Sequence, residues 1–190
     1  MARHLTQLVL AVAAIAWLGV GHVAVRYAQA QPATHGIDAF DRIATVLQGP
    51  RCLNCHPRGD RPRQGDDRHI HLMNVQRGTQ NMGVPAMRCV TCHQTRNNDM
   101  AGIPGAPHWQ LAPVSMAWEG LSKGELCRTL LDPKKNGGRS VAALVQHMTG
   151  DALVQWAWNP GRGRALPALS AGDFKAALDQ WAAAGAPCPN

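Results

Sequence analysis

The 190-residue chain contains the pattern Arg-Cys-x-x-Cys-His twice. The first copy covers residues 51–56 (RCLNCH) and the second covers residues 88–93 (RCVTCH). Each copy places two thiols within one turn of the chain and puts an imidazole directly after the second thiol. No other feature restricts the fold as strongly, because the surrounding chain must accommodate whatever these side chains hold.

Cys-x-x-Cys-His is the attachment signature of c-type haem. The two thiols add to the vinyl groups of the haem, and the histidine that follows lies under the iron as its proximal ligand. The sequence therefore predicts two covalently attached haem c groups. The residues predicted to hold them are Cys52, Cys55 and His56 for the first group, and Cys89, Cys92 and His93 for the second.

Two other chemistries use a Cys-x-x-Cys pair. A thioredoxin-like dithiol follows a strand in an alternating α/β pattern, which is absent from this sequence. A four-cysteine zinc site would combine the two pairs, but it would leave both following histidines without a role. Haem attachment gives a role to every side chain of both patterns, and we prefer it for that reason.

Two further cysteines, Cys127 and Cys188, lie outside the motifs. In an oxidising compartment such a pair is expected to form a disulfide. It would join the "GELCRTLL" segment to the C-terminal "GAPCPN" and stabilise the fold by about 4 kcal/mol in the chain-entropy model. Two separate buried thiols are the alternative.

The N-terminus indicates export. Residues 8–25 are almost wholly apolar, and Ala28-Gln29-Ala30 is a small-x-small cleavage signal. We expect a signal peptide over residues 1–30 and a single domain over residues 31–190 in the periplasm. An uncleaved membrane anchor is the alternative, and only in that case would the protein contact a membrane.

Removal of residues 1–30 leaves 17 basic and 12 acidic residues, a formal charge of +5. The four propionates of two haems would offset part of this excess. There is no run of lysines, and export argues against a nucleic-acid partner, so the basic charge does not indicate nucleic-acid binding.

Periodicity predicts a mainly α fold with short helices, long haem-wrapping loops and no substantial sheet. Amphipathic patterns predict helices over residues 38–48, 140–148 and 170–184. Asp38 is the expected N-cap of the first of these helices. Ser122 and Glu125 form a capping box for a further helix that ends before Pro133.

The residue on the far side of each iron decides between a closed carrier and a site open to chemistry. His71 is the best placed candidate, because Ile70 and Leu72 make its surroundings apolar. His147 lies beside the apolar face of a predicted helix, and His108 in "GAPHW" is a weaker candidate. The sequence does not indicate which of them serves which iron.

Other side chains are expected around the haems. Arginines near the motifs are expected either to pair with propionates or to be solvated: Arg51, Arg77 and Arg88. Tryptophans are expected to pack on haem faces: Trp109, Trp118, Trp156 and Trp158.

The blocks "HLMNVQRG", "MRCVTCHQ", "GAPHWQLAP", "LCRTLLDPKKNGGRS", "DALVQWAWNPGRGR" and "AGAPCP" resemble a group of small exported dihaem proteins. Those proteins are labelled as cytochrome subunits of isoquinoline 1-oxidoreductase-type molybdenum hydroxylases. The resemblance covers roughly residues 50–189. It implies a partner that oxidises an N-heterocycle or an aldehyde, and it adds weight to His71 and His147. No motif in this chain binds molybdopterin or an aromatic substrate.

The expected function is electron transfer rather than catalysis. Such a chain relays electrons from a periplasmic dehydrogenase, such as a molybdenum hydroxylase, toward the respiratory chain. The alternative is a small dihaem enzyme of the peroxidase or sulfur-compound oxidase type, with one open iron.

Overall fold

The structure is a computed structural model that describes residues 33–190. The expected signal peptide lies outside these residues. The described part is mostly helical, with two very small sheets, which confirms the predicted fold class. None of the helices within residues 33–190 is long and apolar enough to cross a membrane.

Residues 33–47 are helical. The α-helices that follow are α2 (Pro50–Leu53), α3 (Cys89–Cys92), α4 (Lys123–Leu131), α5 (Val141–Gly150), α6 (Ala152–Gln155) and α7 (Ala171–Ala183). Two short 3-10 helices are η1 (Val114–Met116) and η2 (Trp156–Trp158). Each sheet is one antiparallel pair: β1 (Arg63–Gln64) with β2 (His69–Ile70), and β3 (Gly83–Val84) with β4 (Met87–Arg88).

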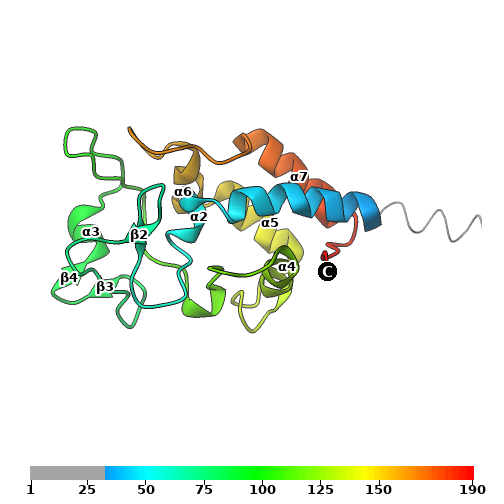
Figure 1. Cartoon of the computed structure of the whole chain (residues 1–190), viewed down its shortest axis with the longest axis horizontal. Coiled ribbons are helices and arrows are strands. Elements are labelled where there is room, and N and C mark those ends of the chain that lie inside the picture. The colour runs from blue at the N-terminus through cyan, green and yellow to red at the C-terminus, as the bar shows by residue number, and fades with distance from the viewer. Residues whose placement is uncertain (1–32) are drawn as a thin grey trace, which may run out of the picture.

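The molecule has two unlike parts (Figure 1). The longer helices gather at one end, and we call residues 33–56 and 105–190 the helical region. Residues 57–104 hold α3 and both small sheets at the other end, and we call them the loop region. The first Cys-x-x-Cys-His motif begins in α2 at the middle of the molecule, and the second lies in the loop region.

The apolar core belongs to the helical region. Its fully buried side chains include Phe40, Leu126, Phe174 and Trp181. The rings of Phe40 and Trp181 lie 5.4 Å apart, so the first long helix and α7 pack directly on each other. This core holds one side of the first motif in place.

Two predictions about α4 are confirmed. The Ser122 side chain accepts a hydrogen bond from the backbone N–H of Glu125, whose carboxylate accepts one from the backbone N–H of Ser122. Cys127 and Cys188 form a disulfide with their Cα atoms 5.5 Å apart. The bond fastens the C-terminus to the core side of α4, where Cys127 is fully buried.

The first helix starts earlier than the expected residue 38, so Asp38 is not its N-cap. Tertiary packing explains the difference. A Cβ on Gly36 would lie 2.5 Å from the Pro187 side chain and 2.7 Å from that of Ala184, so this turn fits closely against the C-terminal segment. A pattern within one helix carries no sign of such a contact.

The loop region is held by arginines that donate to backbone carbonyls. The buried Arg77 guanidinium donates to the carbonyls of Ala112, Pro57 and Gly59. Arg61 donates to the carbonyl of His71 at 3.0 Å. The two terminal nitrogens of Arg77 are therefore committed to the fold, while its buried Nε–H has no hydrogen-bond partner among the described residues.

Candidate haem sites

A cavity of about 550 Å³ lies beside the first motif. Its walls include Cys52, Cys55 and His56 on one side and Leu144, Met148 and Phe174 from α5 and α7 on the other. The volume falls within the range of about 300–1,000 Å³ that is usual for cofactor and ligand sites. The cavity is thus large enough for an apolar cofactor attached to the first motif.

His56 is held in one orientation and one protonation state. Its Nδ1 lies 2.7 Å from the carbonyl oxygen of Met116, and its ring stacks on Trp118 with the centroids 3.4 Å apart. Burial lowers the pKa of His56 to about 4, so the imidazole is neutral at physiological pH. Because Nδ1 donates to Met116, Nε2 keeps its lone pair and can bind a metal.

The thiols of the first motif are neutral as well. Burial raises the pKa of Cys52 to about 12 and that of Cys55 to about 11. Neither forms a disulfide, although Cys127 and Cys188 do. The two free thiols line the cavity, so both are available for attachment to a cofactor held there.

His147 lines the same cavity from α5. Its Nδ1 lies 3.4 Å from the Oδ2 atom of Asp151. The Oδ1 atom of Asp151 accepts the backbone N–H groups of Leu153 and Val154, which fixes this carboxylate at the start of α6. A carboxylate on the far nitrogen is the usual means of orienting a metal-binding histidine. Burial lowers the pKa of His147 and favours its neutral form.

The histidine of the second motif makes the same two kinds of contact as that of the first. The Nδ1 atom of His93 lies 2.7 Å from the carbonyl oxygen of Pro104, and its ring stacks on Trp109 with centroids 4.4 Å apart. Burial lowers the pKa of His93 too. The surroundings differ at Cys92, which is exposed, whereas Cys52, Cys55 and Cys89 are all half-buried.

His71 lies opposite His93. The ring centroids are 6.1 Å apart, and the ring planes are inclined by 76°. Two Nε2 atoms that bind one metal at about 2.0 Å each are about 4 Å apart, which places the ring centroids about 6 Å apart. The pair therefore has the spacing of two histidines on opposite sides of one metal ion.

The other two histidines of interest are less suited. His108 borders the first cavity but is exposed, with a backbone φ of 58°. His69 is exposed and pairs with Asp67, since its Nδ1 lies 2.6 Å from the carboxylate. The structure thus brings His71 and His147 to the two motifs more closely than it does His108.

Arg51 stands where a haem carboxylate could bind. Its side chain is buried and borders the first cavity, and its Nη2 atom pairs with Asp66. Its Nε–H has no hydrogen-bond partner among the described residues. A buried, unpartnered donor at a cavity wall is costly unless a ligand satisfies it, so this site fits a cofactor that carries carboxylates.

The two sites are neighbours. A charge on Cys89 would raise the pKa of Cys55, so the two cysteines lie within electrostatic range of each other. Trp156, which lines the first cavity, meets Trp109 edge to face at 4.8 Å, and Trp109 in turn stacks on His93. Within the described residues, no three or more His, Cys, Asp or Glu side chains gather as a metal cluster, so the cysteine pairs do not converge as in a four-cysteine site.

Three contacts of the candidate ligand histidines were not predicted from the sequence. The indoles of Trp118 and Trp109 stack on the histidines of the motifs rather than only bordering the cavities. No spacing rule links these residues along the chain. Asp151 could have been found, because it lies four residues after His147 and so on the same face of a helix.

Comparison of the chain with known protein families, with curated proteins and with solved structures finds no match. The functional argument therefore depends on the motifs and on the geometry around them.

Proposed function

We propose that the protein is an electron-transfer protein that carries two covalently attached c-type haems. The observation that carries this proposal is the His71–His93 pair, whose 6.1 Å separation suits one metal ion between two imidazoles. The pair stands directly beside Cys89 and Cys92, so its metal would be the iron of a haem attached there. Reversible one-electron reduction of the iron is the chemistry that each haem supplies.

The axial ligands follow from the two sites. His93 and His71 would bind the second iron, and His56 and His147 would bind the first. The neutral state of His56 and the Asp151 contact of His147 support the second assignment. Two histidines available for each iron would leave it closed to a substrate, which favours a carrier over the alternative of a small dihaem enzyme.

The chain contributes orientation, burial and charge. Hydrogen bonds from the Nδ1 atoms of His56 and His93 to backbone carbonyls fix the orientation of both rings. Apolar side chains such as Leu144, Met148 and Phe174 in the walls of the first cavity would lower the polarity around that iron, which helps to set its potential. The free Nε–H of Arg51 would donate to a haem propionate.

The remaining parts of the proposal come from the sequence. Residues 1–30 direct the chain to the periplasm, and residues 31–190 form one dihaem domain. The partners would be periplasmic redox proteins, with a molybdenum hydroxylase as the candidate that the resemblance suggests. Electrons would come from such a dehydrogenase and leave toward the respiratory chain.

The test is electron paramagnetic resonance of the purified oxidised protein, followed by addition of carbon monoxide to the reduced form. Two low-spin irons that do not bind the gas are expected. A high-spin signal or ready gas binding in the unmodified protein would contradict the carrier and favour the enzyme.

A matched pair of variants sharpens this test. His71→Ala should convert one iron to a high-spin, gas-binding form. His69→Ala changes an exposed histidine of the same hairpin, so it should leave both irons low-spin. Equal spectra for the two variants would contradict the role of His71.

A further inference from the structure

The charge of the described residues is concentrated around the second motif. Residues 57–104 and 160–166 hold nine arginines and four aspartates, a net charge of +5. The rest of residues 33–190 holds eight basic and eight acidic side chains, a net charge of zero. Two ion pairs, Arg51–Asp66 and Arg63–Glu119, join the two parts. Together they neutralise one positive and one negative charge in each part, so the net charges of +5 and zero do not change.

The two basic segments are attached to each other. Arg164 donates to the carbonyl of Gly102 at 2.6 Å, and Asn97 donates to the carbonyl of Asn159 at 2.8 Å. The backbone N–H of Ala165 donates to Asp66 at 3.0 Å. Residues 160–166 therefore lie on the loop region and add their charge to it.

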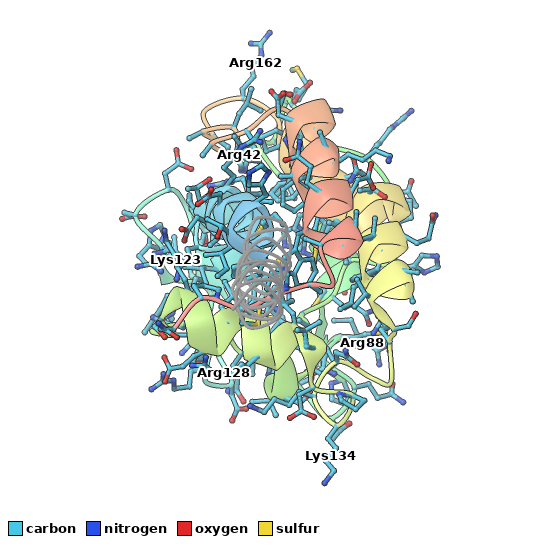
Figure 2. All side chains as sticks on the ribbon, turned by 90° about the vertical axis from the view of Figure 1, so that its right-hand side faces the viewer. Arg42, Arg88, Lys123, Arg128, Lys134 and Arg162 are labelled. Atoms are coloured by element: carbon cyan, nitrogen blue, oxygen red, sulfur yellow. A yellow bond between two sulfur atoms is a disulfide. The ribbon has the colours of Figure 1, made fainter. Side chains whose placement is uncertain are left out.

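A surface cleft of about 570 Å³ opens where these segments meet. Arg96, Arg162 and Arg164 line it, and Asp99 is the acidic residue of its wall. The hydrogen bonds of Arg164 go to neutral carbonyl oxygens, which leave its charge uncompensated. Figure 2 shows Arg162 extending away from the ribbon into solvent.

The cleft is close to the second site. Arg96 lies three residues after His93, and the side chain of Asn97, also in the cleft wall, accepts a hydrogen bond from the indole of Trp156, which meets Trp109 edge to face. Exposed apolar side chains flank the same site, with Val90 at 51%, Ile70 at 47% and Leu72 at 62% exposure. An apolar centre with a charged rim is the arrangement found in transient protein interfaces.

We propose that this surface docks an acidic redox partner protein and makes the second haem the point of electron exchange with it. The proposal depends on the proposed function. A partner with a negative surface is favoured because opposite charges guide the encounter and orient it. Cys52 and Cys55 of the first motif are half-buried, whereas Cys92 is exposed, so a partner can approach the second motif more closely.

A second basic group, in the helical region, is an alternative docking surface for an acidic partner. Lys134, Lys135 and Arg139 border the first cavity, with Asp132 nearby in the same turn. This small basic group lies in the helical region, and Figure 2 shows Lys134 and Arg162 at opposite edges of the molecule. Because this group borders the first cavity, the control uses Arg42 and Arg128 instead, two exposed arginines of the helical region that are not among the residues lining that cavity.

The experiment measures reduction of the two-haem protein by a reduced plant-type [2Fe–2S] ferredoxin, used as an acidic probe protein, in a stopped-flow instrument. The double variant Arg96→Glu/Arg162→Glu is compared with Arg42→Glu/Arg128→Glu and with the unmodified protein. All four side chains are exposed, so neither variant disturbs the core.

We expect the Arg96/Arg162 variant to react roughly tenfold more slowly at low ionic strength, and the Arg42/Arg128 variant to stay near the unmodified rate. The difference should disappear at high salt, because the Debye length falls from about 30 Å at 0.01 M to about 3 Å at 1 M. Equal rates for both variants, or a larger loss in the Arg42/Arg128 variant, would overturn the proposal. Absence of haem absorbance from the purified protein would instead refute the proposed function.

Discussion

The two Cys-x-x-Cys-His motifs share their local geometry but not their surroundings. In both, the histidine Nδ1 lies 2.7 Å from a backbone carbonyl and the ring stacks on a tryptophan. The first motif borders a cavity among α-helices, whereas the second lies among turns with Cys92 exposed. The comparison indicates that the orientation of each histidine is set by its immediate neighbours. The burial of each motif is set by the tertiary fold, and the role of each proposed haem follows from that burial.

Removal of each attachment site in turn should give the largest difference between the two regions. Cys52→Ala/Cys55→Ala would leave the cavity of about 550 Å³ unfilled. Apolar side chains such as Leu144, Met148 and Phe174 would then face water at about 1.5–3 kcal/mol each, a total comparable to the stability of about 5–15 kcal/mol for a domain. We expect this variant to lose its cooperative thermal unfolding by circular dichroism.

Cys89→Ala/Cys92→Ala is the matched control. It should lose one haem by absorbance but keep a cooperative transition of the helical region, because the core side chains lie there. Similar unfolding of both variants would contradict the comparison.

The next largest effect should come from His71 and His147, the proposed second ligands of the two irons. It is measured in the Cys89→Ala/Cys92→Ala protein, in which one haem should remain. In this background His147→Ala should make the remaining iron bind carbon monoxide. His71→Ala should leave it unreactive, because His71 faces His93 and not the first cavity. Gas binding after the His71 change alone would reverse the assignment of the two ligands.

Loss of the disulfide should affect the helical region alone. Cys127→Ser/Cys188→Ser removes a link between residues separated by 61 positions, which the chain-entropy model values at about 4 kcal/mol. Denaturant unfolding should show this loss, while the optical spectrum of the folded protein stays the same. A changed spectrum would mean that the C-terminal segment supports a haem site directly.

The smallest effect should come from Asp151. His147 has a carboxylate on its Nδ1, whereas the Nδ1 of His71 lies 2.8 Å from the backbone carbonyl of Leu72. Asp151→Asn keeps the cap of α6 but removes the charge, which should raise the potential of the first haem. A tenfold change in relative ligand affinity corresponds to about 59 mV for one electron, and we expect a shift below that value in a potentiometric titration.

Asp67→Asn serves as the control for this measurement, since it changes a carboxylate beside the non-ligating His69. It should move neither potential. Equal shifts in the two variants would show a general effect of charge rather than the orientation of His147.

The sequence predicted the features that depend on neighbouring residues or on a fixed motif. The capping box of Ser122 and Glu125 and the mainly α fold class are of this kind. The Cys127–Cys188 disulfide was also predicted, because only two cysteines lay outside the motifs. The capping box and the fold class could be predicted from patterns within short segments, and the disulfide could be predicted by eliminating the four cysteines of the motifs.

Features that depend on distant contacts were not predicted. The early start of the first helix needs the contact of Gly36 with Pro187. The position of His71 between the two motifs in the sequence leaves either iron within reach, and only the folded hairpin places it beside His93. The stacking of Trp118 on His56 likewise joins residues that no local pattern connects.

The most direct test of the account is the intact mass of the exported protein under denaturing conditions, together with its pyridine haemochrome spectrum. The account predicts the mass of the chain plus two haems that stay attached in denaturant, and the mass of one haem less in each cysteine double variant. A chain of unmodified mass whose Cys52, Cys55, Cys89 and Cys92 react as four free thiols would contradict it.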